Sequence, residues 1–326
     1  MGKACSKDIS LPYEASETAY SGDVLYVVLP YFNYCGFERR TQLFVEFVER
    51  IKSVPCVRII ISEGALTNDT FLLPPTMAGA YMHFRFRATD HVWMKENLIN
   101  LAVKKLPVDW KYMAWIDADL TFLNEDWARD TMHRLNSQYD VVQIFQTCIN
   151  MGPCGEALKI DKSFGYMHCE SGKPYHKTAK YGFWHPGFAH ACTRAAYDRM
   201  GGLLDFGILG SGDRHMCLAL IGLVEYSHPG NIHTNYSKML QEYQARVKSL
   251  RFGWVPGTIL HHWHGRLEDR KYQDRWLILT KQQFDPETDI VRNAEGVIVL
   301  TEKGKRLEWH LANYFVERRE DNMTLT

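Results

Sequence analysis

Two aspartates stand directly after an apolar run in the middle of the chain. The segment MAWIDADLTF (residues 113–122) predicts a buried strand that ends in Asp117 and Asp119. In an extended chain, side chains two positions apart point to the same face, so the two carboxylates are expected to lie close together. A divalent cation relieves their repulsion, and Mg²⁺ and Mn²⁺ accept such oxygen ligands. In the alternative interpretation both acids are structural, one as a helix cap and the other as the partner of an arginine.

A third acid, Asp213, follows the glycine-rich stretch GGLLDFGILGSG (201–212). This pattern predicts a helix that begins near Gly212. At a helix start Asp213 is suited to cap free backbone amides, which is the commoner role of an aspartate there. In an open pocket it is suited instead to act as a general base toward a substrate hydroxyl, with Asp205 as the weaker candidate for that role.

Three histidines cluster in ILHHWHGR (259–266). If this segment is extended, His262 and His264 share a face and His261 points away, so two histidines are available as metal ligands. Imidazole together with carboxylate suits Mn²⁺ as well as Zn²⁺. The structural alternative is that the histidines are satisfied within the fold.

Basic residues follow the histidines at once, namely Arg266, Arg270, Lys271 and Arg275. Such a group can hold a phosphate. For at least half of these residues, however, the expected arrangement is a solvated helix face on which the cations pair with neighbouring acids.

The elements that must position these residues alternate along the chain. Apolar runs predict buried strands, and apolar residues at helical spacing predict helices. The order is a strand at 23–30, a helix at 37–51, a strand at 57–62, a helix at 93–106 and a strand at 112–119. This alternation predicts an α/β fold with a parallel sheet, whose ligands gather at the carboxyl ends of the strands. Glu63, the two aspartates of the central segment and the loop at 31–34 are expected at such ends, which indicates a common site.

The remaining residues are expected to surround or extend one domain. Residues 1–22 predict an irregular arm, residues 23–265 the main domain, and residues 266–326 a C-terminal extension packed on it. No internal repeat or low-complexity linker divides the chain. The further elements expected are a strand at 139–146, a long loop with one or two strands at 165–194, a helix at 266–284, a hairpin near 296–304 and a last helix at 305–321.

The composition is that of an ordinary globular protein, with 326 residues of which 46% are hydrophobic. Lys plus Arg and Asp plus Glu number 38 each, so the net charge does not favour nucleic acid or an anionic membrane. The eight cysteines are scattered without CxxC pairs and no signal-peptide pattern is present, which predicts reduced thiols in a cytoplasmic protein. No apolar stretch approaches the roughly 18 to 20 residues that span a bilayer. The motifs of phosphate loops, dinucleotide-binding folds, zincins and α/β-hydrolases are also absent.

Taken in order, four segments resemble nucleotide-sugar-dependent glycosyltransferases of the GT-A fold, especially the family 2-like branch. These segments are VLYVVLPYFNYCGFERR (24–40), RIIISEG (58–64), WIDADL (115–120) and GGLLDFGILGSGDRHMCLALIG (201–222). The resemblance implies a GT-A type, Rossmann-like sheet that is mixed, mostly parallel and flanked by helices, with a C-terminal helical and hairpin elaboration. It also implies a nucleoside-diphosphate sugar as donor and a further molecule, most simply a glycan, as acceptor.

The resemblance implies roles for the residues near the donor. Tyr31 and Asn33 would line the nucleotide pocket, and Glu63 would bond the base. Asp117 and Asp119 would form the DxD motif. In that motif Asp117 would lie beside the ribose and a water molecule bound to the cation. Asp119 would ligate the Mn²⁺ or Mg²⁺ that binds the diphosphate.

Further roles concern the metal shell and the acceptor. His264, or else His262, would complete the metal shell. Asp213 would deprotonate the acceptor hydroxyl in a direct displacement with inversion. Trp184 and His185 lie in YGFWHPGFAH (181–190), where the family places a loop over donor and acceptor, so they would contact sugar unless the aromatic side chain simply packs into the core.

One departure from the family keeps other functions open. The family has a Glu-Asp pair where this chain has Gly212 and Asp213, so an acid thought to bind acceptor hydroxyls is missing. A non-catalytic nucleotide-binding or carbohydrate-binding protein of the same fold is therefore one alternative. A sugar nucleotidyltransferase is another, although the aromatic loop YFNYCGFERR (31–40) lacks the glycine-rich, basic character of such enzymes. A hydrolase that uses the histidines as a zinc site is a third.

Overall fold

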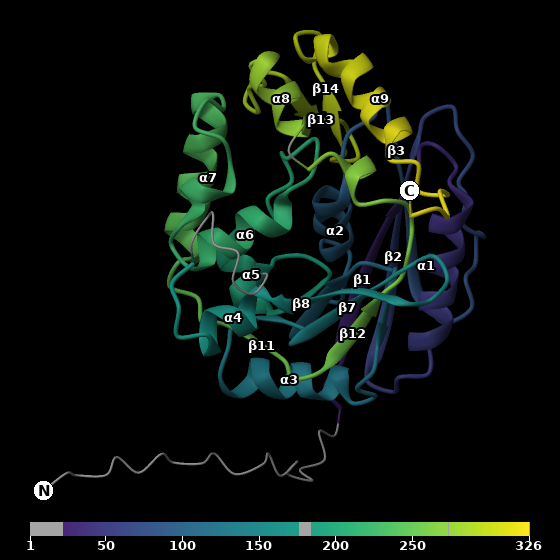
Figure 1. Ribbon diagram of the computed structural model, residues 1–326, viewed down its shortest axis with the longest axis vertical. Helices are drawn as coiled ribbons and strands as arrows, with labels where there is room; N and C mark the ends of the chain where they lie inside the picture. The colour runs from purple at the N-terminus through teal and green to yellow at the C-terminus, as the bar shows by residue number, and fades with distance from the viewer. Residues whose placement is uncertain (1–21, 176–183, 273, 326) are drawn as a thin grey trace, which may run out of the picture.

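The computed structural model describes residues 22–175, 184–272 and 274–325 of the chain. A seven-stranded sheet lies at its centre, with the strand order β11-β6-β10-β4-β1-β2-β3 (Figure 1). Its strands are β1 (Leu25–Phe32), β2 (Val57–Leu66), β3 (Ala80–Ala88), β4 (Tyr112–Ile116), β6 (Val141–Gln143), β10 (Ala189–Thr193) and β11 (Phe252–Trp254).

The sheet is mixed and mostly parallel. β1 pairs in parallel with β2 and β4, β2 with β3, and β6 with β11, whereas β10 runs antiparallel to β4 and β6. The predicted α/β class, with a mostly parallel sheet flanked by helices, is confirmed. Strand β2 continues to Leu66, however, so Glu63 lies within the strand and not at its carboxyl end.

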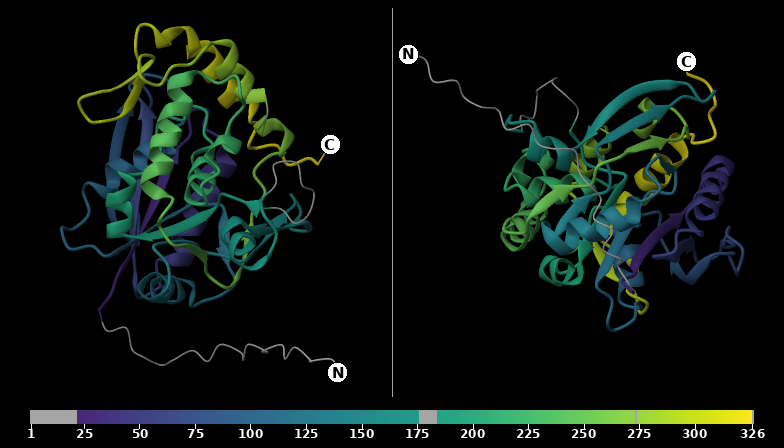
Figure 2. Two further views of the ribbon diagram at one scale, coloured as in Figure 1. Left: turned by 90° about the vertical axis from the view of Figure 1, so that its left-hand side faces the viewer. Right: turned by 90° about the horizontal axis from the view of Figure 1, so that it is seen from below.

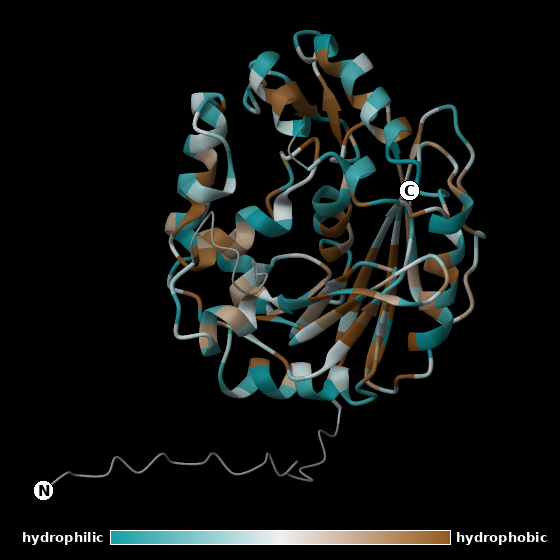
Figure 3. Ribbon diagram, viewed as in Figure 1, coloured by the Kyte–Doolittle hydropathy of each residue, from teal (hydrophilic) through white to brown (hydrophobic). Residues whose placement is uncertain are grey.

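Strand β1, which lies between β4 and β2 in the sheet, is buried on both faces, and its alternating side chains separate two layers of core. Val27 and Leu29 belong to the cluster that contains the apolar residues of α1 (Glu38–Ile51) and α3 (Trp127–Ser137). Val28 belongs to the opposite cluster, which holds α2 (Lys95–Val103), α5 (Arg194–Met200), α6 (Gly212–Leu220) and α7 (Thr234–Val247). Helices therefore cover both faces of the sheet (Figure 2), and hydrophobic residues run along its strands (Figure 3).

A second sheet of five strands, in the order β5-β12-β7-β8-β9, begins where β4 ends. Its strands are β5 (Leu120–Phe122), β7 (Thr147–Met151), β8 (Ala157–Ser163), β9 (Trp184–His185) and β12 (Thr258–His261). Because β5 pairs antiparallel with β12, His261 stands opposite Leu120. This pairing places the histidine segment (259–266) beside the aspartate segment (113–122).

The start of the stretch predicted as a long loop is helical instead. Helix α4 (Phe164–Glu170) begins behind Ser163, whose hydroxyl oxygen accepts the N–H of Tyr166 at 3.1 Å. This N-cap stabilises a short helix that apolar spacing alone does not reveal. The strands expected in the stretch correspond to β9 and β10.

The C-terminal segment packs over the carboxyl end of β1. Phe315 of α9 (Glu308–Glu317) lies edge-on to Phe32 and stacks on Trp93. The Asp321 carboxylate accepts the backbone N–H of Arg39 at 2.8 Å, near the start of α1. The end of the chain therefore lies beside the edge of the sheet where a ligand is expected.

Two of the three elements predicted for this segment are confirmed. The hairpin consists of β13 (Ile290–Arg292) and β14 (Ile298–Leu300), so it begins before the predicted range of 296–304 and only β14 lies within that range, and the last helix is α9. The single helix predicted at 266–284 is wrong, because a 3-10 turn at Glu268–Arg270 is separated from α8 (Asp274–Lys281) by Lys271, whose φ is 45°. Further 3-10 turns lie at Val224–Ser227 and Gly304–Leu307.

Across the described ranges, no helix is long and apolar enough to cross a membrane. All seven cysteines in these ranges are free thiols. Cys5 and nearly all of the arm predicted for residues 1–22 lie outside the described residues.

Candidate active site

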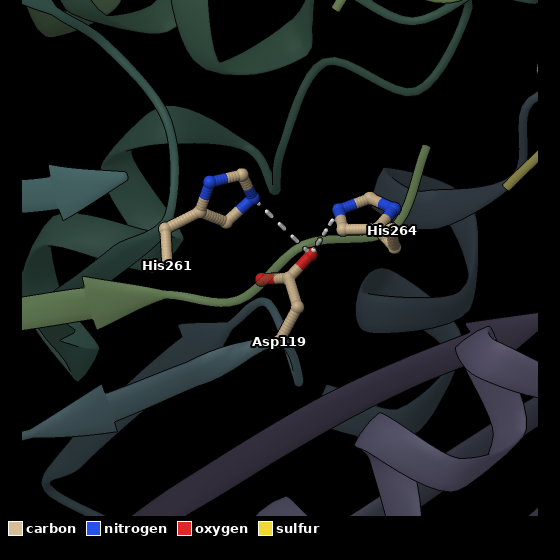
Figure 4. Close-up of side chains that lie close together, drawn as sticks. All are labelled: Asp119, His261 and His264. Carbon is tan, nitrogen blue, oxygen red and sulfur yellow. Dashed lines mark ion pairs between the residues drawn. The ribbon is translucent and has the colours of Figure 1, made fainter. Parts of the chain in front are cut away.

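One acid and two histidines converge beyond the end of β4: Asp119, His261 and His264 (Figure 4). His264 Nε2 lies 2.8 Å from Asp119 Oδ2, and His261 Nε2 lies 3.7 Å from the same oxygen. The possible ligand atoms of all three lie within 4.8 Å of one another, and both histidines are buried. Two imidazoles and a carboxylate that face one volume have the chemistry of a transition-metal site.

A turn, and not an extended strand, holds the two aspartates. β4 ends at Ile116 and β5 begins at Leu120, so Asp117 and Asp119 stand in the connection between them. The extended geometry expected for this pair is therefore wrong. Asp119 contacts the histidines, whereas Asp117 Oδ1 lies 2.7 Å from Lys95 Nζ.

The end of β12 decides which histidines join Asp119. His261 is the last residue of that strand, and beyond it the alternation of side chains no longer applies. His261 and His264 therefore converge, while His262 Nε2 forms a hydrogen bond of 2.8 Å with the Thr121 hydroxyl. The expectation that His262 and His264 share a face is wrong, and the structure does not bring His262 into the cluster.

The surroundings of the cluster fit a bound cation. Among the described residues, Asp119 Oδ1 and His261 Nε2 are buried and have no hydrogen-bond partner. His261 Nδ1 lies 3.0 Å from Asn150 Oδ1. Because that oxygen can only accept, the Nδ1 proton points to it and the Nε2 lone pair faces the cluster.

The charges of these groups also suit a cation. Burial lowers the pKa of His261 well below its ordinary value. Burial alone would raise the pKa of Asp119, but the contacts with His261 and His264 and the charge of Arg270 outweigh it and hold that pKa well below the ordinary value. A neutral imidazole and an ionised carboxylate are the forms that ligate a metal.

A buried lysine connects Asp117 with Asp213. Lys95 Nζ donates to Asp213 Oδ2 at 2.9 Å while it also contacts Asp117. Burial opposes the charge of Lys95, but Asp117 and Asp213 raise its pKa well above the ordinary value. Burial raises the pKa of Asp117 to about 6 despite Lys95. For Asp213, burial is outweighed by Lys95 and then His190, so its pKa is lowered and it is a carboxylate at neutral pH.

The carboxylate of Asp213 is not used as a helix cap among the described residues. Its Oδ2 accepts from Lys95, and no described residue donates to Oδ1. The preceding Gly212, where the family has glutamate, has no room for a side chain because the Glu96 carboxyl group fills the space of a Cβ. Glu96 is itself buried, and burial raises its pKa to about 8.

The weaker candidate base, Asp205, has its carboxylate occupied. Arg292 donates to both of its oxygens, at 2.8 and 2.7 Å. Asn97 and Asn100 also donate to Oδ2, each at 3.2 Å. These contacts tie the hairpin of the C-terminal segment to α2, which is a structural role.

The structure also gives Glu63 partners inside the protein. Its carboxylate accepts the N–H of Leu73 at 2.9 Å and the Nε hydrogen of Arg85 at 3.0 Å, and it lies 3.1 Å from His83 Nε2. Burial raises the pKa of Glu63, but the hydrogen bonds with His83 and Leu73 and the charge of Arg85 bring it below the ordinary value. Its contacts therefore fasten the loop at 67–79 to β2 and β3.

Tyr31 and Asn33 lie at the carboxyl end of β1 and anchor α1. The Tyr31 hydroxyl lies 2.7 Å from Thr41 Oγ1. Asn33 donates to the Phe37 carbonyl at 2.9 Å and accepts the Phe37 N–H at 3.0 Å. Both residues occupy the edge of the sheet that carries Asp117, and their side-chain polar atoms have local partners.

Trp184 and His185 are neighbours in β9 but have different surroundings. Trp184 lies edge-on to Phe164, with ring centroids 5.1 Å apart, and is packed against the core. His185 stacks on Phe188 with centroids 3.9 Å apart, and burial lowers its pKa to about 3. The space beside Gly187 is bordered by His185 and by Asp213 Oδ2, so His185 is the one that the structure brings near Asp213.

Sequence reasoning misses three residues of this site, namely Lys95, Glu96 and His261. A signal for the first two exists in WMKENLIN (93–100). The apolar residues after Lys95 and Glu96 lie on several sides of the predicted helix, which indicates that the whole helix is buried. Charges in a buried helix need partners. No comparable signal favours His261, because the end of β12 depends on its pairing with β5.

No protein-family model matches the chain, and no curated protein matches its sequence. Similar solved structures include the catalytic domain of Drosophila beta1,4galactosyltransferase 7, with 13% identity, a TM-score of 0.41 and coverage of 86% of this chain and 93% of that one. Glucosyl-3-phosphoglycerate synthase from Mycobacterium tuberculosis has 12% identity and a TM-score of 0.40, with coverage of 80% and 77%. Mannosyltransferase PcManGT from Pyrobaculum calidifontis has 14% identity and a TM-score of 0.42, with coverage of 79% and 61%. These neighbours are GT-A glycosyltransferases. Because the identities and TM-scores are low, the function proposed for this chain rests on its own residues.

Proposed function

We propose that the chain is a metal-dependent glycosyltransferase that moves a sugar from a nucleoside-diphosphate sugar to an acceptor hydroxyl. The observation that carries this proposal is that Lys95 contacts two acids of the candidate site. This one buried cation contacts Asp117, which adjoins the candidate metal site, and Asp213, which is the candidate base. A site for the leaving group and a site for the attacking hydroxyl therefore lie side by side.

Asp119, His261 and His264 would hold the cation. Mg²⁺ and Mn²⁺ both accept carboxylate oxygen, but the two imidazoles favour Mn²⁺ over Mg²⁺. When bound, such a cation neutralises the diphosphate as it leaves. Asn150 orients His261 for this task, and the low pKa of Asp119 keeps its carboxylate available.

Asp213 would take the proton of the acceptor hydroxyl at Oδ1, because Oδ2 is held by Lys95. The acceptor oxygen then attacks the anomeric carbon while the bond from that carbon to the diphosphate breaks on the opposite face. This direct displacement inverts the configuration. Lys95 holds the carboxylate in place and favours its ionised form.

The other expected residues would act around this centre. Tyr31 and Asn33 border the place for the nucleoside at the end of β1, and Asp117 would lie beside its ribose. Glu63 would support the base pocket by fixing the loop at 67–79. His185 would border the acceptor, for which a glycan is the simplest candidate, and Trp184 would support that side from the core.

A two-part experiment tests this function. First, UDP, GDP, CDP and TDP are each added with Mn²⁺ or with EDTA, and the melting temperature is recorded. A ligand at a hundredfold excess over its dissociation constant stabilises the folded state by about 2.7 kcal/mol, so one nucleotide should raise the melting temperature with Mn²⁺ only. Absence of any shift with Mn²⁺ would contradict the proposal.

Second, release of the selected nucleoside diphosphate from its sugar donors is measured with a set of simple glycans. Asp213→Asn should bind the nucleotide as the wild type does and lose transfer by about 100-fold or more. Asp198→Asn is the matched control, because its carboxylate is exposed and pairs only loosely with Arg194 at 3.7 Å. Transfer near the wild-type rate in Asp213→Asn would show that the base is another group.

A further inference from the structure

The basic residues after the histidine segment divide into two kinds. Arg266 pairs with Asp269 at 3.4 Å, and Lys271 pairs with Glu317, as on a solvated protein face. Arg270 and Arg275 form no ion pair with any acid in the described ranges; their hydrogen bonds go to hydroxyl groups, a backbone carbonyl and the His264 ring. Neither guanidinium group is therefore held by a carboxylate of its own.

Arg270 is the more enclosed of the two, with 8% of its surface exposed. Its Nη2 lies 2.8 Å from His264 Nε2, and its Nη1 donates to the Tyr272 hydroxyl at 3.3 Å. Its Nε is buried and has no acceptor in the part of the chain that the structure describes. Because a buried donor without an acceptor is unfavourable, this Nε is suited to an anion that arrives from solution.

The contacts of His264 point to where that anion binds. Its Nε2 lies 2.8 Å from both Arg270 Nη2 and Asp119 Oδ2. Nε2 carries either a hydrogen for Asp119 or a lone pair for Arg270, so it cannot serve both neighbours at once. If Nε2 instead held a cation, Arg270 Nη2 would need another acceptor, which an anionic oxygen beside the cation would supply.

Neighbouring groups add positive charge on the same side. The Arg275 guanidinium lies 5.0 Å from the centre of the Tyr272 ring and donates to Ser211 Oγ at 2.6 Å. The charge of Glu320 also acts on Arg270, but Glu320 accepts from Arg318 at 2.6 Å and is paired with Arg40. Its carboxylate is therefore shared among three guanidinium groups.

We propose that Arg270, with Arg275 behind it, binds a phosphate group beside the candidate metal site. The source of that phosphate rests on the proposed function, in which the donor carries a diphosphate. A planar guanidinium matches phosphate oxygens in geometry, and its charge stabilises the nucleoside diphosphate as the bond to the sugar breaks. A phosphorylated acceptor offers the same chemistry, and the experiment separates the two sources.

The test measures binding by calorimetry to the full chain with Mn²⁺. The probes are inorganic pyrophosphate, the nucleoside diphosphate selected above, the matching nucleoside, and inorganic phosphate added to protein saturated with that nucleotide. The variants are Arg270→Gln, Arg270→Lys and Arg275→Gln. Arg266→Gln is the matched control, because Arg266 has its own acid.

Arg270→Gln should weaken binding of pyrophosphate and of the nucleoside diphosphate by about 10- to 100-fold, whereas affinity for the nucleoside stays unchanged. Arg266→Gln should bind every probe as the wild type does. If Arg270→Gln does not fold, Arg270→Lys and Arg275→Gln should still weaken the phosphate probes selectively, by a smaller factor. A loss confined to inorganic phosphate on the saturated protein assigns the site to a phosphorylated acceptor.

The two proposals fail in different ways. Unchanged affinity of the Arg270 and Arg275 variants for every phosphate probe overturns the phosphate site and leaves the transferase in place. Pyrophosphate binding that depends on Arg270, without binding of any nucleotide, overturns the proposed transferase and supports the phosphate site. Absence of binding by the wild type to any probe overturns both.

Discussion

Replacement of Lys95 by methionine tests how the two halves of the candidate site depend on each other. Methionine keeps the apolar length of the side chain and removes only the charge. Lys95 Nζ lies 2.7 Å from Asp117 and 2.9 Å from Asp213, so the variant leaves two carboxylates without their shared cation.

The size of the effect follows from these contacts. Loss of one partner from a buried ion pair costs about 3 to 5 kcal/mol, and a hydrogen bond to a charged group contributes about 1.5 to 3 kcal/mol. The side chains of Asp117 and Asp213 are 29% and 20% exposed, so water screens part of the loss. We therefore expect the free energy of unfolding to fall by about 3 kcal/mol at pH 8.

The effect should also depend on pH in a definite direction. Without Lys95, the pKa values of both acids in the folded state rise above those of the unfolded chain. The unfolded chain then ionises at lower pH than the folded variant, so the loss grows as pH rises. It shrinks as pH falls below the ordinary aspartate pKa of about 4 and disappears only below the lowered pKa of Asp213 in the wild type.

Urea unfolding between pH 4 and pH 8 measures this loss for the wild type, Lys95→Met and the double variant with Asp213→Asn. The double variant should recover part of the stability, because it removes one of the two unpaired charges. Lys111→Met is the control, since Lys111 pairs with Asp23 at the surface, and it should change stability little at any pH. A loss for Lys95→Met that is the same at pH 4 and pH 8 would refute the reasoning.

Two further predictions concern the metal site and a buried acid. His264→Ala should weaken Mn²⁺ binding, measured by electron paramagnetic resonance, by at least about 100-fold. Removal of a residue that only hydrogen-bonds to a ligand weakens metal binding by about 10- to 100-fold, and removal of a ligand itself should weaken it at least as much. His262→Ala, which loses only its contact with Thr121, should bind Mn²⁺ within a few-fold of the wild type; equal losses in both variants would contradict the ligand set. Because the pKa of Glu96 is raised to about 8, the folded state holds a proton that the unfolded chain has released, so wild-type stability should fall between pH 6 and pH 8 by up to about 1.4 kcal/mol per pH unit. Glu96→Gln should flatten this slope, and parallel stability curves for the two proteins would contradict it.

The sheet could be predicted from the sequence wherever a strand is buried on both faces. The apolar runs that became β1, β2 and β4 have no other arrangement that removes them from water, and the helices between them force parallel crossovers. Strand β3 is not predicted, because it lies at the edge of the sheet and His83, Arg85 and Arg87 interrupt its apolar residues. The alternation of these residues with Met82, Phe84 and Phe86 is the signal that the sequence offers for it.

The candidate site was predictable in part. Asp119, Asp213 and His264 have residue types that suit a metal or a base, and they follow strands or open a helix, so local pattern was enough to select them. The partners of these residues were not predictable by the same means. Glu63, Tyr31 and Asn33 were selected by their place at strand ends, and the structure gives their polar atoms partners within the protein.

The sequence by itself determined the layered α/β plan and the identity of the acids near the end of β4 and the start of α6, because burial and periodicity act over a few neighbouring residues. Tertiary structure alone decided that His261 and not His262 joins Asp119, since the pairing of β12 with β5 sets where the strand stops. It also decided that Lys95 joins Asp117 to Asp213, since that contact requires α2 and α6 to pack on the same face of the sheet. Contacts between segments far apart in the chain depend on packing, which no local pattern encodes.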